Sequence, residues 1–129
     1  MTHRDSELLR KFEAYEVDAA AFGHRQHVQV AFEMLHKYSY LDACAKYANA
    51  INTIATRAGA TDKFNVTITF AFLSLIAERV HSNPGLDFEA FLAENADLMA
   101  KNALDRWYSS EDLRSDFARR HFLLPRQSA

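Results

Sequence analysis

The sequence contains few of the residues that break or cross-link a chain. Its 129 residues include three glycines, two prolines and one cysteine. Small all-β domains need many tight turns, which glycine and proline supply, so their scarcity favours long helices joined by few loops. The lone Cys44 excludes an internal disulfide. With no export signal after Met1 either, we expect a cytoplasmic protein.

An excess of basic residues and long apolar runs are also missing. Fifteen Lys and Arg stand against seventeen Asp and Glu, giving a formal net charge of -2. Nucleic-acid binding usually needs a basic face, so we predict no nucleic-acid partner. No apolar run approaches the ~20 residues of a membrane-spanning helix, which predicts no membrane partner. Hydrophobic residues at 49% suit one globular domain over 1–129, with a loose tail at 125–129.

Apolar residues recur at three- and four-residue spacing along most of the chain. This periodicity predicts an all-α, compact bundle of about five to seven helices. We expect helices at 6–17, 24–38, 41–58, 61–80, 87–94, 96–107 and 110–121. The 61–80 segment is apolar around nearly its whole circumference, which is typical of a central helix. The 41–58 helix is expected to bury a stripe that begins with Leu41 and Cys44.

Two histidines stand at the start of the second expected helix. At about 100° per residue, Val28, Ala31 and Leu35 fall in one narrow apolar sector. His24 projects onto the centre of that sector and His27 lies beside it, so both rings are predicted to face inward. Glu33 falls on the opposite, polar side.

The spacing of His24 and His27 places two imidazoles next to each other on one helix face. Histidine titrates near neutral pH, which makes both residues candidates for catalytic acid–base chemistry. They are also candidate metal ligands, although catalytic metal sites commonly have three protein ligands. An equally weighted alternative is that both are core histidines whose nitrogens bond to neighbouring polar groups.

Further polar residues lie on the apolar 61–80 helix and near the C-terminus. Thr67, Ser74 and Glu78 fall on one stripe, Asn65 and Thr69 form a second polar pair, and basic residues gather near 119. We predict the following residues to bind a substrate: Asn65, Thr67, Thr69, Ser74, Glu78 and Arg119. The alternative is that the Thr and Ser hydroxyls bond carbonyls four residues back. The arginines would then form exposed ion pairs with neighbouring acids.

Three motifs in the chain resemble those of a largely uncharacterised family of small helical bacterial proteins. The first is H-x-x-H-V, preceded by an aromatic residue, and covers 22–28. The second is K-[FY]-[HN]-x-T-x-T over 63–69. The third is [YF]-S-x-x-x-L-x-S-x-x-A-R-x-x-F over 108–122. The resemblance implies a histidine and a glutamate on the central helix, where this chain has Asn65 and Val66.

The departure at Asn65 bears on the metal hypothesis, because asparagine is a weak ligand for transition metals. Three functions therefore stay open. The first is a small-molecule enzyme that uses His24 and His27 in a pocket between helices, with no firmly implied cofactor. The second is a non-catalytic module that binds a ligand or a protein, including a homodimer. The third is a metal-dependent enzyme with a transition metal at His24 and His27, completed by Asn65 or Glu78.

Overall fold

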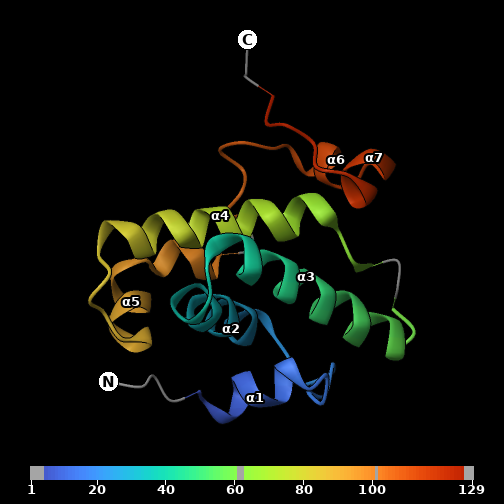
Figure 1. Ribbon diagram of the computed structural model, residues 1–129. Helices are drawn as coiled ribbons and strands as arrows, with labels where there is room; N and C mark the ends of the chain where they lie inside the picture. The colour runs from blue at the N-terminus through green and yellow to red at the C-terminus, as the bar shows by residue number, and fades with distance from the viewer. Residues whose placement is uncertain (1–4, 61–62, 101, 127–129) are drawn as a thin grey trace.

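The computed structural model describes residues 5–60, 63–100 and 102–126, and across these ranges the chain forms helices and no strand (Figure 1). The prediction of an all-α bundle is confirmed. The helices are α1 (Glu7–Glu13), α2 (His24–Lys37), α3 (Tyr40–Arg57), α4 (Val66–Ser82), α5 (Phe88–Glu94), the 3₁₀ helix η2 (Ala96–Met99), α6 (Ser110–Leu113) and α7 (Asp116–Arg120). No described helix is both long enough and apolar enough to cross a membrane.

Helices α2 and α4 form the middle of the bundle. In Figure 1, α1 lies below α2, while α4 lies above α2 and α3. Helix α2 packs against α1, α3, α4, α5 and η2, and α4 packs against α2, α3 and α7. Leu73 and Ile76 of α4 are buried, as expected for an apolar central helix. The enclosure of α2 explains why Val30, outside the predicted apolar sector, is fully buried.

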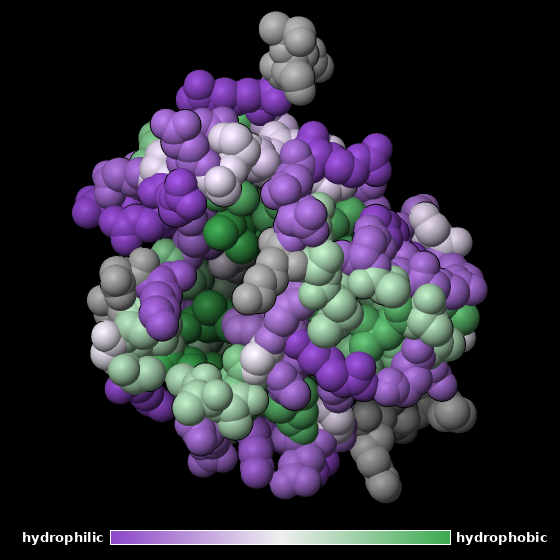
Figure 2. Space-filling view, turned by 180° about the vertical axis from the view of Figure 1, so that it is seen from behind, coloured by the Kyte–Doolittle hydropathy of each residue, from purple (hydrophilic) through white to green (hydrophobic). Residues whose placement is uncertain are grey.

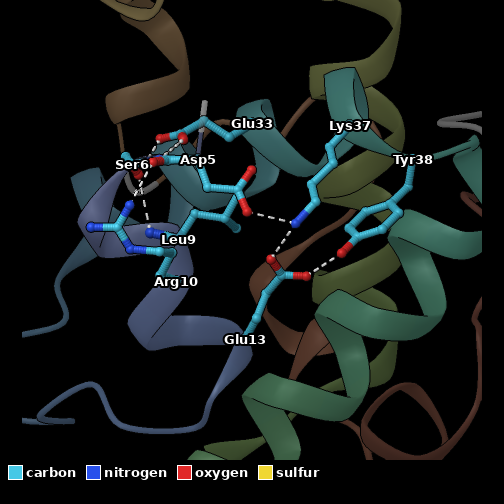
Figure 3. Close-up of polar contacts among 8 residues, drawn as sticks. All are labelled: Asp5, Ser6, Leu9, Arg10, Glu13, Glu33, Lys37 and Tyr38. Atoms are coloured by element: carbon cyan, nitrogen blue, oxygen red, sulfur yellow. Dashed lines mark hydrogen bonds and ion pairs between the residues drawn. The ribbon is translucent and has the colours of Figure 1, made fainter. Parts of the chain in front are cut away.

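The prediction that Glu33 faces water is wrong, because α1 covers that side of α2. Glu33 is 8% exposed and accepts hydrogen bonds from Ser6 and Gln29. The Oγ of Ser6 lies 3.0 Å from Oε2 of Glu33, and it also accepts from the backbone N–H of Leu9 at the start of α1. Ser6 therefore caps the N-terminus of α1 and also bonds α1 to α2 (Figure 3).

A second polar cluster bonds the residue before Ser6 and the last residue of α1 to the end of α2. Lys37 Nζ lies 2.7 Å from Oδ2 of Asp5 and 2.8 Å from Oε1 of Glu13, and the Tyr38 hydroxyl donates to Glu13 (Figure 3). Burial by itself would lower the pKa of Lys37. The hydrogen bonds with Asp5, Glu13 and Tyr38 outweigh it and raise the pKa above its usual range. Lys37 therefore stays charged and holds two carboxylates.

Several helix boundaries differ from the sequence prediction. Helix α1 ends at Glu13 instead of 17, and Tyr15 takes a left-handed backbone with φ of 61°. Leu41 is 79% exposed, so the prediction that the buried stripe of α3 begins with Leu41 is wrong. The expected 96–107 helix is only η2 followed by turns. The expected 110–121 helix is divided, because Ser115 accepts from the N–H of Ala118 and begins α7.

The first residues of the expected 61–80 helix, at 61 and 62, lie outside the described ranges, as does 127–129 of the expected loose tail. Within the described part, α4 begins at Val66. Cys44 is buried, as its assignment to the core predicted, and burial raises the pKa of its thiol.

Candidate functional site

A cavity of about 260 Å³, called here the histidine cavity, opens beside the first turns of α2. Figure 2 shows the molecule from behind the view of Figure 1. On this face, hydrophobic surface lies in a hollow between hydrophilic side chains. The polar residues that line the histidine cavity are His24, His27, Tyr47, Lys63, Asn65 and Thr69. The apolar ones are Ala31, Ile51, Phe64, Ile68, Phe72 and Leu73. Mostly apolar walls with a few polar groups are typical of small-molecule sites.

His24, the first residue of α2, lines the rim of the cavity but is exposed, so the prediction that its ring faces inward with the apolar sector is wrong. Its Nε2 lies 2.7 Å from the backbone carbonyl oxygen of Leu98 in η2. A carbonyl can only accept, so Nε2 carries a hydrogen. In the neutral ring Nδ1 is then the proton acceptor. The ring also contacts Phe72 of α4 edge-on, at 5.3 Å between ring centroids.

The 3₁₀ helix that fixes His24 is itself held to α4. Arg79 of α4 makes a two-point contact with Asp97 of η2, with N–O distances of 2.9 and 2.7 Å. Its NH1 also donates to the buried Asn95 at 2.9 Å. The Leu98 carbonyl follows directly in the chain, so its position depends on this contact.

His27 lies one turn further into the cavity and is half-buried. Its Nδ1 lies 3.2 Å from the hydroxyl oxygen of Tyr47 on α3, and its ring meets Phe22 edge-on at 4.5 Å. Burial, with a smaller contribution from the nearby His24, lowers the pKa of His27 from 6.5 to about 4. His27 is therefore a neutral hydrogen-bonding group near pH 7.

Asn65 and Thr69 line the histidine cavity with the two histidines, so the structure brings together these predicted site residues. Asn65 already has partners, however. Its Oδ1 accepts from the N–H of Ile68 and begins α4, while its Nδ2 donates to the Leu113 carbonyl at 2.7 Å. Thr69 is half-buried and takes part in fewer structural contacts than Asn65. It is therefore better placed than Asn65 to contact a ligand.

Four predicted substrate-binding residues lie elsewhere. Thr67 is fully buried, donates to the His121 carbonyl and accepts from the N–H of Leu123. It therefore bonds the C-terminal segment and not the carbonyl four residues back. Ser74 and Glu78 line a different cavity of about 150 Å³ near Tyr108. Arg119 lies 3.3 Å from Asp116, and is not among the residues lining the histidine cavity.

The sequence prediction missed Tyr47 and Lys63 as residues of this cavity. Tyr47 had a usable signal, because it stands four residues before Ile51 and seven before Ile54, which places all three on one face of α3. Lys63 lies in the segment before α4, where no periodicity indicates a direction. Its place on the cavity wall follows from the fold alone.

Across the described residues, no group of three or more His, Cys, Asp or Glu side chains is arranged to hold a metal ion. Of the two guesses for a third ligand, Asn65 lines the histidine cavity and Glu78 does not. Asn65 uses its oxygen to begin α4, and Glu78 lines the other cavity. The metal hypothesis is left with His24 and His27 as its ligands.

Comparison of the chain with protein-family models, with curated proteins and with solved structures gave no match. The resemblance of its three motifs to a family of small helical proteins therefore stays a prediction.

Proposed function

We propose that the protein binds a small, largely apolar molecule in the histidine cavity and that His24 exchanges a proton with it. The observation that carries the proposal is the pair of imidazoles on one turn of α2, both on the wall of a mostly apolar cavity. A few polar groups in an apolar pocket orient a ligand, and a histidine among them can act as acid or base.

The two histidines would have different roles. The Leu98 carbonyl fixes the hydrogen of His24 on Nε2, which leaves Nδ1 to accept a proton. His27, with its pKa lowered to about 4, is neutral near pH 7 and positions the ligand by hydrogen bonding. This assignment refines the prediction that either ring serves as the acid or base, and it favours His24.

The test is a screen of small fragments, each with an aromatic or short aliphatic group and one polar group, by ligand-observed NMR. Binding fragments are expected to shift the imidazole signals of His24 and His27. His24→Gln and His27→Gln should each weaken binding about tenfold, the loss of one good hydrogen bond. His81→Gln, an exposed histidine of α4 outside the cavity, is the matched control and should bind as the parent does.

Catalysis is tested separately with the fragments that bind. New product signals should grow in the presence of the parent protein and of His81→Gln, and not of His24→Gln. Fragments that bind the double His24→Gln, His27→Gln variant as well as the parent would place the site elsewhere. If these variants lose their helical circular dichroism, the histidines are structural, and Thr69→Leu then tests whether filling the cavity blocks binding.

A second candidate is a non-catalytic ligand-binding module. It is favoured by His27, which is neutral near pH 7 and bonded to Tyr47, so one of the two histidines is unsuited to proton exchange there. Fragments that bind at the histidines and stay chemically unchanged would support this function over the enzyme.

The other hypotheses keep simple tests. Elemental analysis of protein produced with added zinc, iron and copper tests the metal alternative, and a metal content near zero rules it out. Sedimentation tests the homodimer, for which the most exposed apolar side chains of the C-terminal region are Phe117 and Leu124.

A further inference from the structure

A second cavity of about 270 Å³, called here the alanine cavity, adjoins the histidine cavity. The two share four lining residues: His27, Ile51, Lys63 and Phe64. These four residues form a partition common to the two spaces. The alanine cavity continues from this partition between Phe22, in the segment before α2, and the last turns of α3.

The volumes favour one extended site. Pockets for small molecules usually measure roughly 300–1,000 Å³. Each cavity alone, at about 260 and 270 Å³, falls below that range, and the two joined fall within it. A ligand that occupies both must pass the His27 side chain and is therefore long and narrow.

The two cavities differ in polarity. Apart from the shared His27 and Lys63, every residue that lines the alanine cavity is apolar. Four of them are alanines, at positions 19, 55, 58 and 60, whose short side chains leave the space open. The histidine cavity adds the polar groups of His24, Tyr47 and Thr69. An aliphatic chain suits the first space and a polar head group the second.

The positive charge of Lys63, at the partition between the two cavities, indicates which head group a ligand would carry. Lys63 lines both cavities and is exposed, and it makes no ion pair with another described residue. No described aspartate or glutamate lines either cavity. An anionic group of a ligand would complement the lysine ammonium in this setting.

We propose that the site takes an unbranched aliphatic carboxylate, with its chain in the alanine cavity and its carboxylate against Lys63. This inference rests on the proposed function, because it assigns the substrate class of the same site. It places the carbons nearest the head group beside His27, which lines both cavities, and the carboxylate on the side of the histidine cavity.

The experiment measures the binding of butanoate, hexanoate, octanoate and hexan-1-ol by NMR titration of the full chain. Each buried methylene should strengthen binding about fourfold, which corresponds to roughly 0.8 kcal/mol. Hexanoate should bind about 1.4-fold to fivefold more tightly than hexan-1-ol, which corresponds to the roughly 0.2–1 kcal/mol of an exposed ion pair. All four compounds should shift the His27 ring signals.

Two variants with matched controls test the halves of the proposal. Ala55→Leu fills the alanine cavity and should abolish the gain with chain length, whereas Ala45→Leu, exposed on the same helix and outside both cavities, should keep it. Lys63→Gln should reduce hexanoate binding to that of hexan-1-ol, whereas Lys11→Gln should not. If Ala55→Leu does not fold, the exposed Ala58→Leu fills the same space.

The outcomes separate this inference from the proposed function. Equal affinity for butanoate and octanoate overturns the assignment of the chain, and equal affinity for hexanoate and hexan-1-ol overturns that of the carboxylate. In both cases fragments that still bind at His24 and His27 leave the proposed function standing. If neither carboxylates nor fragments move the imidazole signals, both proposals fail.

Discussion

The imidazole Nδ1 of His27 lies 3.2 Å from the hydroxyl oxygen of Tyr47, which is 6% exposed. Burial raises the pKa of Tyr47 above its usual range and lowers that of His27 to about 4, so both groups are neutral near pH 7. The contact joins α2 to α3 across the cavity. It also occupies Nδ1, so Nε2 is the nitrogen of His27 left for a ligand.

Tyr47→Phe should destabilise the fold, because it leaves a half-buried imidazole nitrogen without its partner. We expect a loss of about 1–3 kcal/mol in the free energy of unfolding, measured by urea titration. The control is Tyr40→Phe, whose hydroxyl lies 2.6 Å from the Ser74 hydroxyl but whose side chain is exposed. Its cost should stay below about 1 kcal/mol. Equal losses in the two variants would contradict the structural role of the His27–Tyr47 contact.

His27 should make stability depend on pH. Its folded pKa of about 4 lies below the ordinary 6.5, so between these values the unfolded chain binds a proton that the folded chain does not. Stability therefore falls as the pH drops from 6.5 to 4, by about 3 kcal/mol in all and about 2 kcal/mol by pH 5. Urea titrations at pH 7 and 5 measure this difference. It should shrink in His27→Gln and persist in His81→Gln; a His27→Gln profile as steep as the parent's would refute the assignment.

Thr67→Val keeps the shape of a fully buried side chain and removes both of its hydrogen bonds to the C-terminal segment. The His121 carbonyl and the Leu123 N–H lose their partner, so we expect a loss of about 1–3 kcal/mol. Hydrogen exchange at Leu123 should also accelerate. Thr69→Val is the comparison, since it alters the cavity wall with little effect on stability. A Thr67→Val variant as stable as the parent protein would show that the C-terminal segment does not depend on Thr67.

Ser6→Ala tests the attachment of α1, because the hydroxyl both begins α1 and bonds the buried Glu33. Ser39→Ala removes a comparable contact at the start of α3 without a second partner. Loss of such a capping contact typically costs ~1 kcal/mol. Ser6→Ala should exceed Ser39→Ala by about 1 kcal/mol in urea titrations, the share of the Glu33 contact. Equal losses of stability in the two variants would mean that the hydrogen bond between Ser6 and Glu33 does not stabilise the fold.

The fold class and the histidine pair could be predicted from the sequence because both depend on local periodicity. The start of α2 at His24 and the inward position of His27 follow from the spacing of apolar residues along one helix, whereas His24, predicted to face inward as well, lies exposed at the rim. Asn65 and Thr69 were placed for the same reason. What lies on one helix face can be predicted without knowing its neighbour.

The rest required tertiary packing. Glu33 and Val30 are buried because α1 covers a side of α2 that its own pattern marks as exposed or irregular. Thr67 looks like part of a polar stripe with Ser74, yet Thr67 forms hydrogen bonds with the C-terminal segment, whereas Ser74 lines a separate cavity. Lys63 reaches the cavity through a connecting segment, and no rule of periodicity applies there.

The contact between His24 and the Leu98 carbonyl links the site to the Arg79–Asp97 charge pair. Arg79 and Asp97 anchor η2 at the surface, where dissolved ions weaken such attractions. A higher ionic strength should therefore weaken the attachment of η2 to α4, and with it the orientation of the His24 imidazole toward a ligand of any charge.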